Sequence, residues 1–249
     1  MSAPPARVAI VVPALNEALA IREVVTSALA QCPDVFVVDD GSSDATAAII
    51  AELPVRVIRH AQRMGKGRSL KDGMRAAFDA GFDAVVSMDG DGQHGSEDVP
   101  RLIQAHASHP TALLLCARLI GRETQPGLRR FANHFADFWV SWACGVRVLD
   151  SQCGQRLYPR VLMEAIAMPT ADGFAFESEV LINAAQSGFV IAAVPIRARY
   201  HAGRRASHFQ PLRDVARITR MIFWKIVFRG FALPSLYRSL ARPASILDT

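Results

Sequence analysis

Long apolar runs and metal-type cysteine motifs are missing from this sequence of 249 residues. No stretch reaches the roughly 18 uninterrupted apolar residues that a spanning helix needs, so we expect a soluble or peripheral protein. The four cysteines, Cys32, Cys116, Cys144 and Cys153, show no C-x-x-C spacing, which favours reduced thiols in a cytosolic protein over a zinc site. Polar residues interrupt the apolar N-terminal stretch, which therefore indicates a first strand and not a signal peptide.

Internal repeats and low-complexity windows are also absent, and aromatic residues make up only 8% of the chain. We therefore expect an ordered chain, in which 51% hydrophobic residues supply one sizeable core. A net charge of +5 favours anionic partners such as phosphates, anionic lipid or nucleic acid. A solvated basic surface explains the charge equally well, so the positions of the arginines must decide.

Strand and helix patterns alternate from the N-terminus to about Arg118. Short apolar runs rich in β-branched residues predict buried strands at 7–15, 34–40, 55–60, 82–88 and 111–118. Segments with helical spacing of apolar residues separate these runs, for example at 16–32, 67–81 and 97–108. This alternation predicts an open, mostly parallel α/β sheet.

The remainder of the chain departs from this alternation. It shows a long helical pattern at 126–145, a helix near 176–188, a strand at 190–200, a basic loop from 201 and a terminal helix. No linker separates two domains in this pattern. We predict one domain over residues 1–210, followed by a helical extension over residues 211–249.

The extension begins with an amphipathic pattern at residues 211–229. Arg213, Arg217 and Arg220 fall on one face, and the apolar face holds Val215, Ile218, Ile222 and Ile226, extended by Trp224 and Phe228. Such a helix can lie in the headgroup layer of an anionic membrane with its apolar face inserted. We predict peripheral contact with the inner face of the cell membrane, and packing of this helix on the sheet is the alternative.

Polar and mostly acidic residues follow three of the predicted strands. They are Asn16 and Glu17 after the first strand, Asp39 and Asp40 after the second, and Asp89 and Asp91 after the fourth. A turn or a helix cap explains any one of these sets. Open α/β sheets bind ligands at the carboxyl ends of their strands, so the three sets together predict a binding site.

Asp89 and Asp91 belong to the segment MDGDGQH. In a tight turn that contains glycine, both carboxylates can converge on one hard divalent cation, which keeps water and substrate phosphates in its remaining positions. Gln93 can add a carbonyl oxygen. We therefore expect Mg²⁺ or Mn²⁺ at Asp89, Asp91 and Gln93.

The segment RMGKGRSLKDG raises the question of a phosphate-binding loop. It does not match the Walker pattern, because the glycine spacing is wrong and no Ser or Thr follows Lys66. Gly65 and Gly67 can still let the backbone approach a diphosphate, with Lys66 nearby. A glycine-rich helix start with a solvated lysine is the alternative.

The motifs VVPALNE, VFVVDDGSSDAT, RMGKGRSLKDGMRAA, VVSMDGDGQH, DSQCGQRLYP, FAFESE and VPIRARY follow one another in this order. From about Arg7 to about Phe209 the chain thereby resembles family 2 glycosyltransferases of the GT-A fold, especially dolichyl- and polyprenyl-phosphate sugar synthases and related bacterial lipid glycosyltransferases. The resemblance implies a single GT-A domain. It also implies metal-dependent, inverting transfer from a UDP- or GDP-linked sugar to a lipid-linked acceptor at the cytoplasmic membrane face, with no role for nucleic acid.

The resemblance, together with the patterns above, assigns residues to this chemistry. The nucleotide sugar is expected at Pro13, Asn16, Glu17, Asp39, Asp40, Lys66 and Asp89. The phosphate of the acceptor or the donor is expected at Arg118 and Arg130, and the acceptor phosphate also at Arg204, Arg205 and His208. Gly92, Gln155 and His208 stand where the polyprenyl-phosphate enzymes commonly carry leucine, phenylalanine and lysine. These departures leave the acceptor open.

The nature of the acceptor decides whether a base is needed. A hydroxyl must lose its proton in the transition state, and Asp150, Glu177 and Glu179 are the candidate carboxylates. A phosphate is already anionic and needs no strong base. A polyprenyl phosphate, a glycolipid and a soluble sugar hydroxyl therefore all remain open as acceptors.

Two other classes of protein share parts of this pattern. A nucleotidylyltransferase uses a similar sheet and metal pair, but it should carry a glycine-rich basic loop after the first strand, where this chain has PALNE. A receiver-like α/β module explains VVDDGS, but it explains neither the second acidic pair nor the length of the chain.

Overall fold

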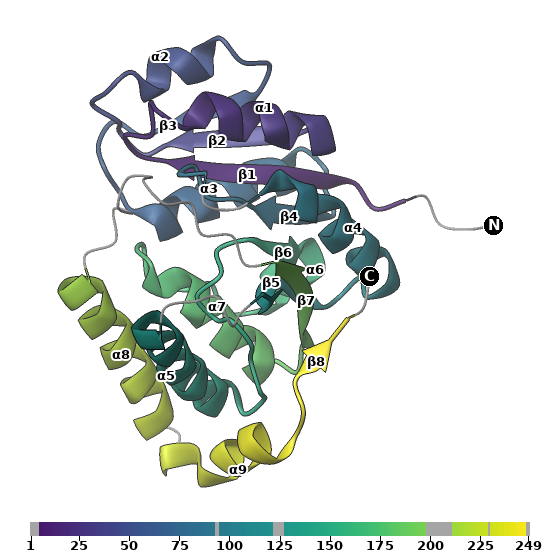
Figure 1. Ribbon diagram of the computed structural model, residues 1–249, viewed down its shortest axis with the longest axis vertical. Helices are drawn as coiled ribbons and strands as arrows, with labels where there is room; N and C mark the ends of the chain where they lie inside the picture. The colour runs from purple at the N-terminus through teal and green to yellow at the C-terminus, as the bar shows by residue number, and fades with distance from the viewer. Residues whose placement is uncertain (1–4, 93–94, 122–126, 198–210, 229, 248–249) are drawn as a thin grey trace.

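The computed structural model describes residues 5–92, 95–121, 127–197, 211–228 and 230–247. In this part of the chain eight strands form one sheet with helices on both faces (Figure 1). The strand order is β3-β2-β1-β4-β6-β5-β7-β8, and every neighbouring pair is parallel except the two that involve β6. The predicted α/β class with a mostly parallel sheet is confirmed.

The elements have the following bounds. The strands are β1 (Val8–Ala14), β2 (Val35–Asp39), β3 (Arg56–Arg59), β4 (Ala84–Ser87), β5 (Leu113–Ile120), β6 (Arg156–Pro159), β7 (Ile191–Arg197) and β8 (Ser245–Ile246). The helices are α1 (Ile21–Gln31), α2 (Thr46–Ala51), α3 (Lys66–Asp79), α4 (Val99–Ser108), α5 (Gly127–Cys144), α6 (Arg160–Ala165), α7 (Ala175–Gln186), α8 (Pro211–Val227) and α9 (Leu233–Ala241).

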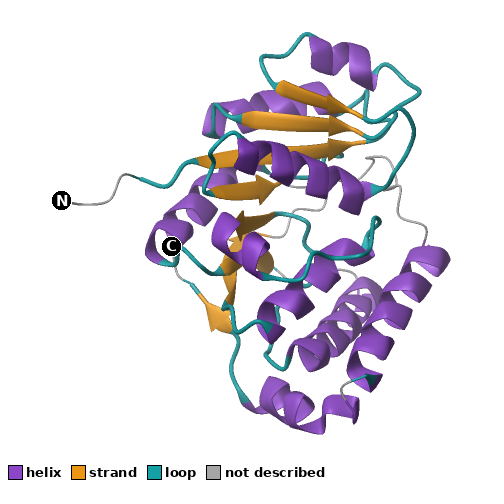
Figure 2. Cartoon of the chain, turned by 180° about the vertical axis from the view of Figure 1, so that it is seen from behind, coloured by secondary structure: helices purple, strands orange, loops and turns teal. Residues whose placement is uncertain are grey.

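Alternate side chains of β1 enter two apolar cores, one on each face of the sheet. Ala9 and Val11 belong to the core shared with α3, α5, α7 and α8, whereas Ile10 and Val12 belong to the core shared with α1 and α4. Figure 2 shows the sheet between its helices from the opposite side. Burial on both faces explains why the strands read as continuous apolar runs.

Strand β6 was not expected, because it has only four residues and begins with the charged Arg156. Arg156 is 1% exposed, and its guanidinium donates to the main-chain oxygens of Cys153, Glu177 and Ser151 at 2.8, 2.7 and 2.8 Å. A buried charge is tolerated when its donors are satisfied in this way. Arg156 thereby fixes the loop before β6 against the start of α7.

The predicted terminal helix is present as α8, but two isoleucines of its predicted membrane face are buried in the protein. Ile222 and Ile226 are 4% and 2% exposed and belong to the core that α5 and α7 also form. Packing α8 beside α5 buries this isoleucine face and leaves Phe223, Trp224 and Phe228 exposed (Figure 1). The predicted boundary at residue 210 lies outside the described residues. Among the described helices, none combines the length and apolarity needed to cross a bilayer.

Candidate active site

A pocket of about 90 Å³ opens at the carboxyl ends of β1 and β4. The two strands are parallel neighbours, so the turns that follow them meet at one edge of the sheet. The pocket lining includes Pro13, Glu17, Asp40, Arg63, Lys66, Asp89, Asp91 and Phe174. Most of the residues predicted for the nucleotide sugar therefore lie around one opening.

Lys66, the first residue of α3, is paired with two carboxylates of this site. Its Nζ lies 2.7 Å from Oδ1 of Asp89 and 3.0 Å from Oε2 of Glu177. Burial alone would lower the pKa of Lys66, but the charges of Asp89 and Glu177 and the hydrogen bonds to them raise that pKa above its ordinary value. The side chain is only 15% exposed, which excludes the alternative of a solvated surface lysine.

The ion pair between Lys66 and Asp89 occupies space that a side chain at position 154 would fill. A Cβ atom at position 154 would lie 2.5 Å from Oδ2 of Asp89 and 3.0 Å from Nζ of Lys66. The Ser87 hydroxyl, at the end of β4, donates to the Gly154 carbonyl oxygen at 2.6 Å and holds that backbone in place. The loop before β6 therefore packs against the turn that carries Asp89.

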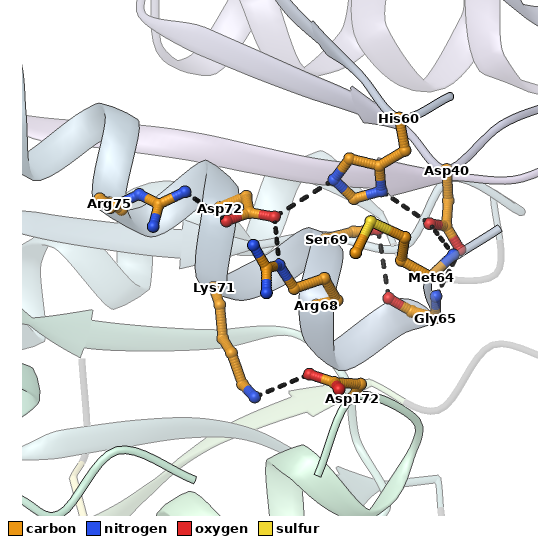
Figure 3. Close-up of polar contacts among 10 residues, drawn as sticks. All are labelled: Asp40, His60, Met64, Gly65, Arg68, Ser69, Lys71, Asp72, Arg75 and Asp172. Carbon is orange, nitrogen blue, oxygen red and sulfur yellow. Dashed lines mark hydrogen bonds and ion pairs between the residues drawn. The ribbon is translucent and has the colours of Figure 1, made fainter. Parts of the chain in front are cut away.

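Asp40 organises the loop that leads into α3 (Figure 3). Its carboxylate accepts the main-chain N–H groups of Met64 and Gly65 and lies against Nδ1 of His60, each at 2.8 Å. Nε2 of His60 lies 3.3 Å from Oδ2 of Asp72, in an orientation that makes no hydrogen bond. Asp40 thus lines the pocket and also positions the loop that carries Lys66.

Asp72 completes this network on α3. Its carboxylate accepts from Nε of Arg68 and from Nη2 of Arg75, both at 2.6 Å (Figure 3). Burial would raise the pKa of Asp72, but the hydrogen bond and charge of Arg68 and the charge of Arg75 hold that pKa below its ordinary value. The preceding residue, Lys71, donates to Asp172 at 2.9 Å and ties α3 to the loop before α7.

Asn16 and Glu17 join the turn after β1 to the turn after β2. Oδ1 of Asn16 accepts the Ser43 main-chain N–H at 2.8 Å, and the Glu17 main-chain N–H donates to Oγ1 of Thr46 at 2.7 Å. Asn16 has a φ of 53°, a left-handed conformation that asparagine tolerates better than most residues. Glu17 lines the pocket, whereas the Asn16 amide is used to hold the two turns together.

Asp39 is fully buried beneath these turns. Its Oδ1 accepts the Ser42 main-chain N–H at 2.9 Å. Its Oδ2 lies 3.2 Å from Nε of Arg59 but makes no hydrogen bond in this orientation. Asp39 is therefore held by one hydrogen bond and one ion pair, and it is not in the pocket lining.

Asp150 and Arg118 form an ion pair at the end of β5. Nε and Nη2 of Arg118 donate to the two carboxylate oxygens of Asp150 at 2.7 and 2.6 Å. Asp137 in turn accepts the main-chain N–H groups of Asp150 and Ser151 at 3.1 and 2.7 Å, and burial raises the pKa of Asp137. The predicted phosphate-binding arginine and one predicted base are therefore bound to each other.

Glu177 and Glu179 are both buried in the first turns of α7. Glu177 pairs with Lys66 through Oε2, while its Oε1 is buried without a hydrogen bond. Glu179 accepts the main-chain N–H groups of Thr170 and Ala171 at 3.0 and 3.1 Å and lies 3.3 Å from Nζ of Lys225. Glu179 therefore joins the loop before α7 to α8.

The structure does not describe four of the remaining predicted site residues, and the fifth is on α5. Gln93, Arg204, Arg205 and His208 lie outside the described residues. Arg130 is exposed near the start of α5.

Three residues that shape the site were not predicted. Gly154 and Arg156 belong to the segment CGQR, whose role depends on contacts with β4 and α7 that no local spacing encodes. Arg63 is the first residue of the segment RMGKGRSLKDG, and its basic charge was the signal available in the sequence.

The oxygens in the pocket suit a hard divalent cation. Asp89 and Asp91 come from one turn and both line the pocket, and a φ of 69° at Gly92 lets that turn fold back. The described residues contain no group of three His, Cys, Asp or Glu side chains that could hold a metal. Two carboxylates are enough for Mg²⁺ or Mn²⁺ when water and a diphosphate supply the other oxygens.

Comparison with known proteins agrees with this geometry. Residues 9–183 match the family model for glycosyl transferase family 2. The chain is 29% identical to a polyprenol monophosphomannose synthase of Mycolicibacterium smegmatis, over 78% of this chain and 77% of that protein. It is 32% identical to an undecaprenyl-phosphate mannosyltransferase of Micrococcus luteus, over 66% of this chain and 70% of that protein.

A solved structure shares the fold over most of the chain. It is glucosyl-3-phosphoglycerate synthase from Mycobacterium tuberculosis, in complex with Mn²⁺, uridine diphosphate and phosphoglyceric acid. The TM-score is 0.65 with 25% sequence identity, and the match covers 90% of this chain and 78% of that one.

Proposed function

The chain belongs to glycosyl transferase family 2, and on that premise we propose that it transfers a sugar from a nucleotide-diphosphate sugar to the phosphate of a polyprenyl-type lipid. Two of its relatives are named polyprenol monophosphomannose synthase and undecaprenyl-phosphate mannosyltransferase. The glycosyltransferase activity follows from the family. The donor, the acceptor and the metal are the parts that we propose.

The carboxylates near the site supply the main support for a phosphate acceptor. Asp150 is bound by Arg118, Glu177 by Lys66 and Glu179 by Lys225. In each of these pairs a carboxylate oxygen is already in contact with a cation, so a substrate hydroxyl would have to compete with that cation for the oxygen. An acceptor that is already anionic needs no such base. The three candidate bases are therefore better explained as residues that position the site.

The donor is proposed to lie in the pocket at β1 and β4. Mg²⁺ or Mn²⁺ held by Asp89 and Asp91 would offset the charge that builds on the leaving nucleoside diphosphate. Oδ2 of Asp39, which is ion-paired with Arg59 but accepts no hydrogen bond, could accept an N–H group of uracil or guanine, or a ribose hydroxyl. UDP- and GDP-linked sugars both fit this description.

The transfer is proposed to be a single in-line displacement. One oxygen of the acceptor phosphate forms a bond to the anomeric carbon while the bond from that carbon to the donor diphosphate breaks. The nucleoside diphosphate leaves with the electron pair, and the configuration at the anomeric carbon inverts. A phosphate dianion loses no proton in this step, so the charges balance without a base.

Contact with an anionic membrane is proposed for the outer face of α5 and α8. Phe131 and Phe135 on α5 and Trp224 and Phe228 on α8 are 69%, 53%, 47% and 82% exposed. Residues 127–144 and 211–242 hold nine of the 28 lysines and arginines but only two of the 23 acidic residues. Exposed aromatic side chains among basic residues are typical of surfaces that bind the headgroup region, here on the cytoplasmic side.

A soluble phosphorylated acid is the second candidate acceptor. It is favoured by the structural match to a synthase solved with phosphoglyceric acid. Transfer to the free hydroxyl of phosphoglyceric acid would need one of the carboxylates as a base, and the exposed aromatic residues would then have no role in the reaction.

Direct transfer assays test the proposal. The full chain would be incubated with Mn²⁺ and a panel of UDP- and GDP-sugars, with either polyprenyl phosphate in mixed micelles or phosphoglyceric acid as acceptor. We expect labelled sugar to enter the butanol phase as a lipid phosphodiester. Transfer to phosphoglyceric acid alone would favour the second candidate. Transfer to neither acceptor would contradict both.

A further inference from the structure

A second cavity, of about 530 Å³, adjoins the donor pocket. It lies between the start of α3, the loop before α7 and α8. Arg63, Lys66 and Phe174 line both this cavity and the donor pocket. A ligand in the second cavity would therefore lie next to a sugar donor bound in the first pocket.

The charges that line this cavity are arranged to attract an anion. Its two carboxylates are already neutralised, because Asp172 pairs with Lys71 at 2.9 Å and Glu179 lies 3.3 Å from Lys225. Arg217 and Arg220 of α8 also line the cavity. No ion pair of these two arginines with a described residue is present.

Arg217 and Arg220 are three positions apart, a spacing that puts them on the same side of α8. The guanidinium group presents its donors in a planar fork that matches phosphate oxygens, and two such groups can share one phosphate. Arg63, in the loop before α3, also lines the cavity. The part of the cavity that these arginines line is thus suited to a phosphate monoester.

Another part of the cavity lining is aromatic. Trp224 lines it and is 47% exposed, and its ring stacks on Phe228 with the centroids 5.3 Å apart. Phe228 is itself 82% exposed, so the aromatic surface continues from the cavity to the outside of α8. A ligand that fits both parts has a phosphate at one end and an apolar chain at the other.

We propose that Arg217 and Arg220 bind the phosphate of the lipid acceptor and that Trp224 contacts the first units of its apolar chain. This inference rests on the proposed function and adds the location of the acceptor. The residues predicted earlier for the acceptor phosphate were Arg118, which is bound to Asp150, Arg130, and three residues outside the described part of the chain. The α8 arginines are therefore an independent assignment.

Binding and transfer should be measured separately, with farnesyl phosphate as a short lipid phosphate. The double variant Arg217→Ala/Arg220→Ala should raise both the Kd and the KM for farnesyl phosphate by at least about tenfold, since each charge-assisted contact with phosphate is strong. Its thermal stabilisation by the nucleoside diphosphate with Mn²⁺ should stay as in the wild type. Arg147→Ala is the matched control, because Arg147 is exposed, lies outside both cavities and should change neither constant.

A third variant distinguishes the source of the phosphate. Trp224→Ala should raise the KM for farnesyl phosphate severalfold and leave the KM for phosphoglyceric acid unchanged. Equal effects on both acceptors would overturn the assignment of Trp224 to the apolar chain.

The outcomes separate this inference from the proposed function. If the wild type binds and glycosylates farnesyl phosphate but the double variant keeps its Kd and KM within twofold, the α8 site is wrong and the proposed function stands. If the wild type binds farnesyl phosphate through these arginines but never glycosylates it, the site stands and the proposed function fails. No binding by the wild type contradicts both.

Discussion

The carboxyl edge of the sheet and the exposed surface of α5 and α8 differ in whether their charged side chains have partners within the protein. At the sheet edge, Asp40, Asp89 and Glu177 are each bound by a cation or by main-chain N–H groups. On α8, Arg217 and Arg220 have no ion-pair partner among the described residues, and apolar rings are exposed beside them. The first region is organised before a ligand arrives, whereas the second depends on its ligand to complete it. Variants in the first should change turnover, and variants in the second should change acceptor or membrane affinity.

The largest expected effect comes from the acidic turn. Asp91→Ala should reduce turnover by about 10³-fold or more, because one remaining carboxylate holds a divalent cation poorly. Donor-dependent release of nucleoside diphosphate, with and without EDTA, measures this. Asp79→Ala, at the exposed end of α3, is the matched control. An Asp91→Ala enzyme that works at near-normal rate in EDTA would show that the metal assignment is wrong.

A smaller loss of turnover is expected at Gly154. The new Cβ of Gly154→Ala would meet Oδ2 of Asp89, and this flexible carboxylate can move aside without unfolding the protein. A displacement of about 1 Å at a reacting site can cost roughly 10²-fold in rate. We expect a kcat lowered by tens of fold and a nearly unchanged Tm. Gly127→Ala, where a Cβ meets nothing within 4 Å, is the control. Equal kcat values for the two variants would remove Gly154 from the account.

Membrane affinity should respond to the exposed rings and not to the sheet edge. Phe131→Ser/Phe228→Ser should weaken cosedimentation with anionic vesicles by about tenfold per inserted ring, since burying a phenylalanine contributes roughly 1.5–3 kcal/mol. Binding should also weaken as salt is raised. Val57→Ser changes an exposed apolar residue on β3 and should have no effect. Unchanged pelleting of the double variant would mean that another surface meets the membrane.

The smallest effect concerns pH and the network on α3. The pKa of Asp72 is lowered in the folded state, so its contribution to the free energy of unfolding is present above the ordinary aspartate pKa and is lost as pH falls below it. Asp72→Asn should flatten the dependence of Tm on pH between about 5 and 3. The difference in the free energy of unfolding should stay below about 1 kcal/mol. Asp79→Asn should leave the wild-type slope. A wild-type slope in Asp72→Asn would show that its ion pairs contribute nothing to stability.

The same contrast between regions explains what the sequence could predict. The strands β1, β2 and β4 and the acidic residues after them were predictable, because doubly buried strands and polar strand ends leave local patterns. The contact of Gly154 with Asp89 joins residues far apart in the chain, and no spacing encodes it. The face of α8 was misjudged for a related reason. Its isoleucines and its aromatic residues are both apolar, and only the position of α5 and α7 decides which set is buried.

The absence of a base is the central chemical claim, and a solvent isotope effect tests it most directly. Single-turnover transfer to polyprenyl phosphate would be measured in H₂O and D₂O at matched positions on the pH profile. If the acceptor is a phosphate dianion, no proton moves in the transition state, and the two rates should be equal. A rate clearly slower in D₂O would show that a proton is transferred in the transition state. That result would contradict the account and return Glu177 or Asp150 to the role of base.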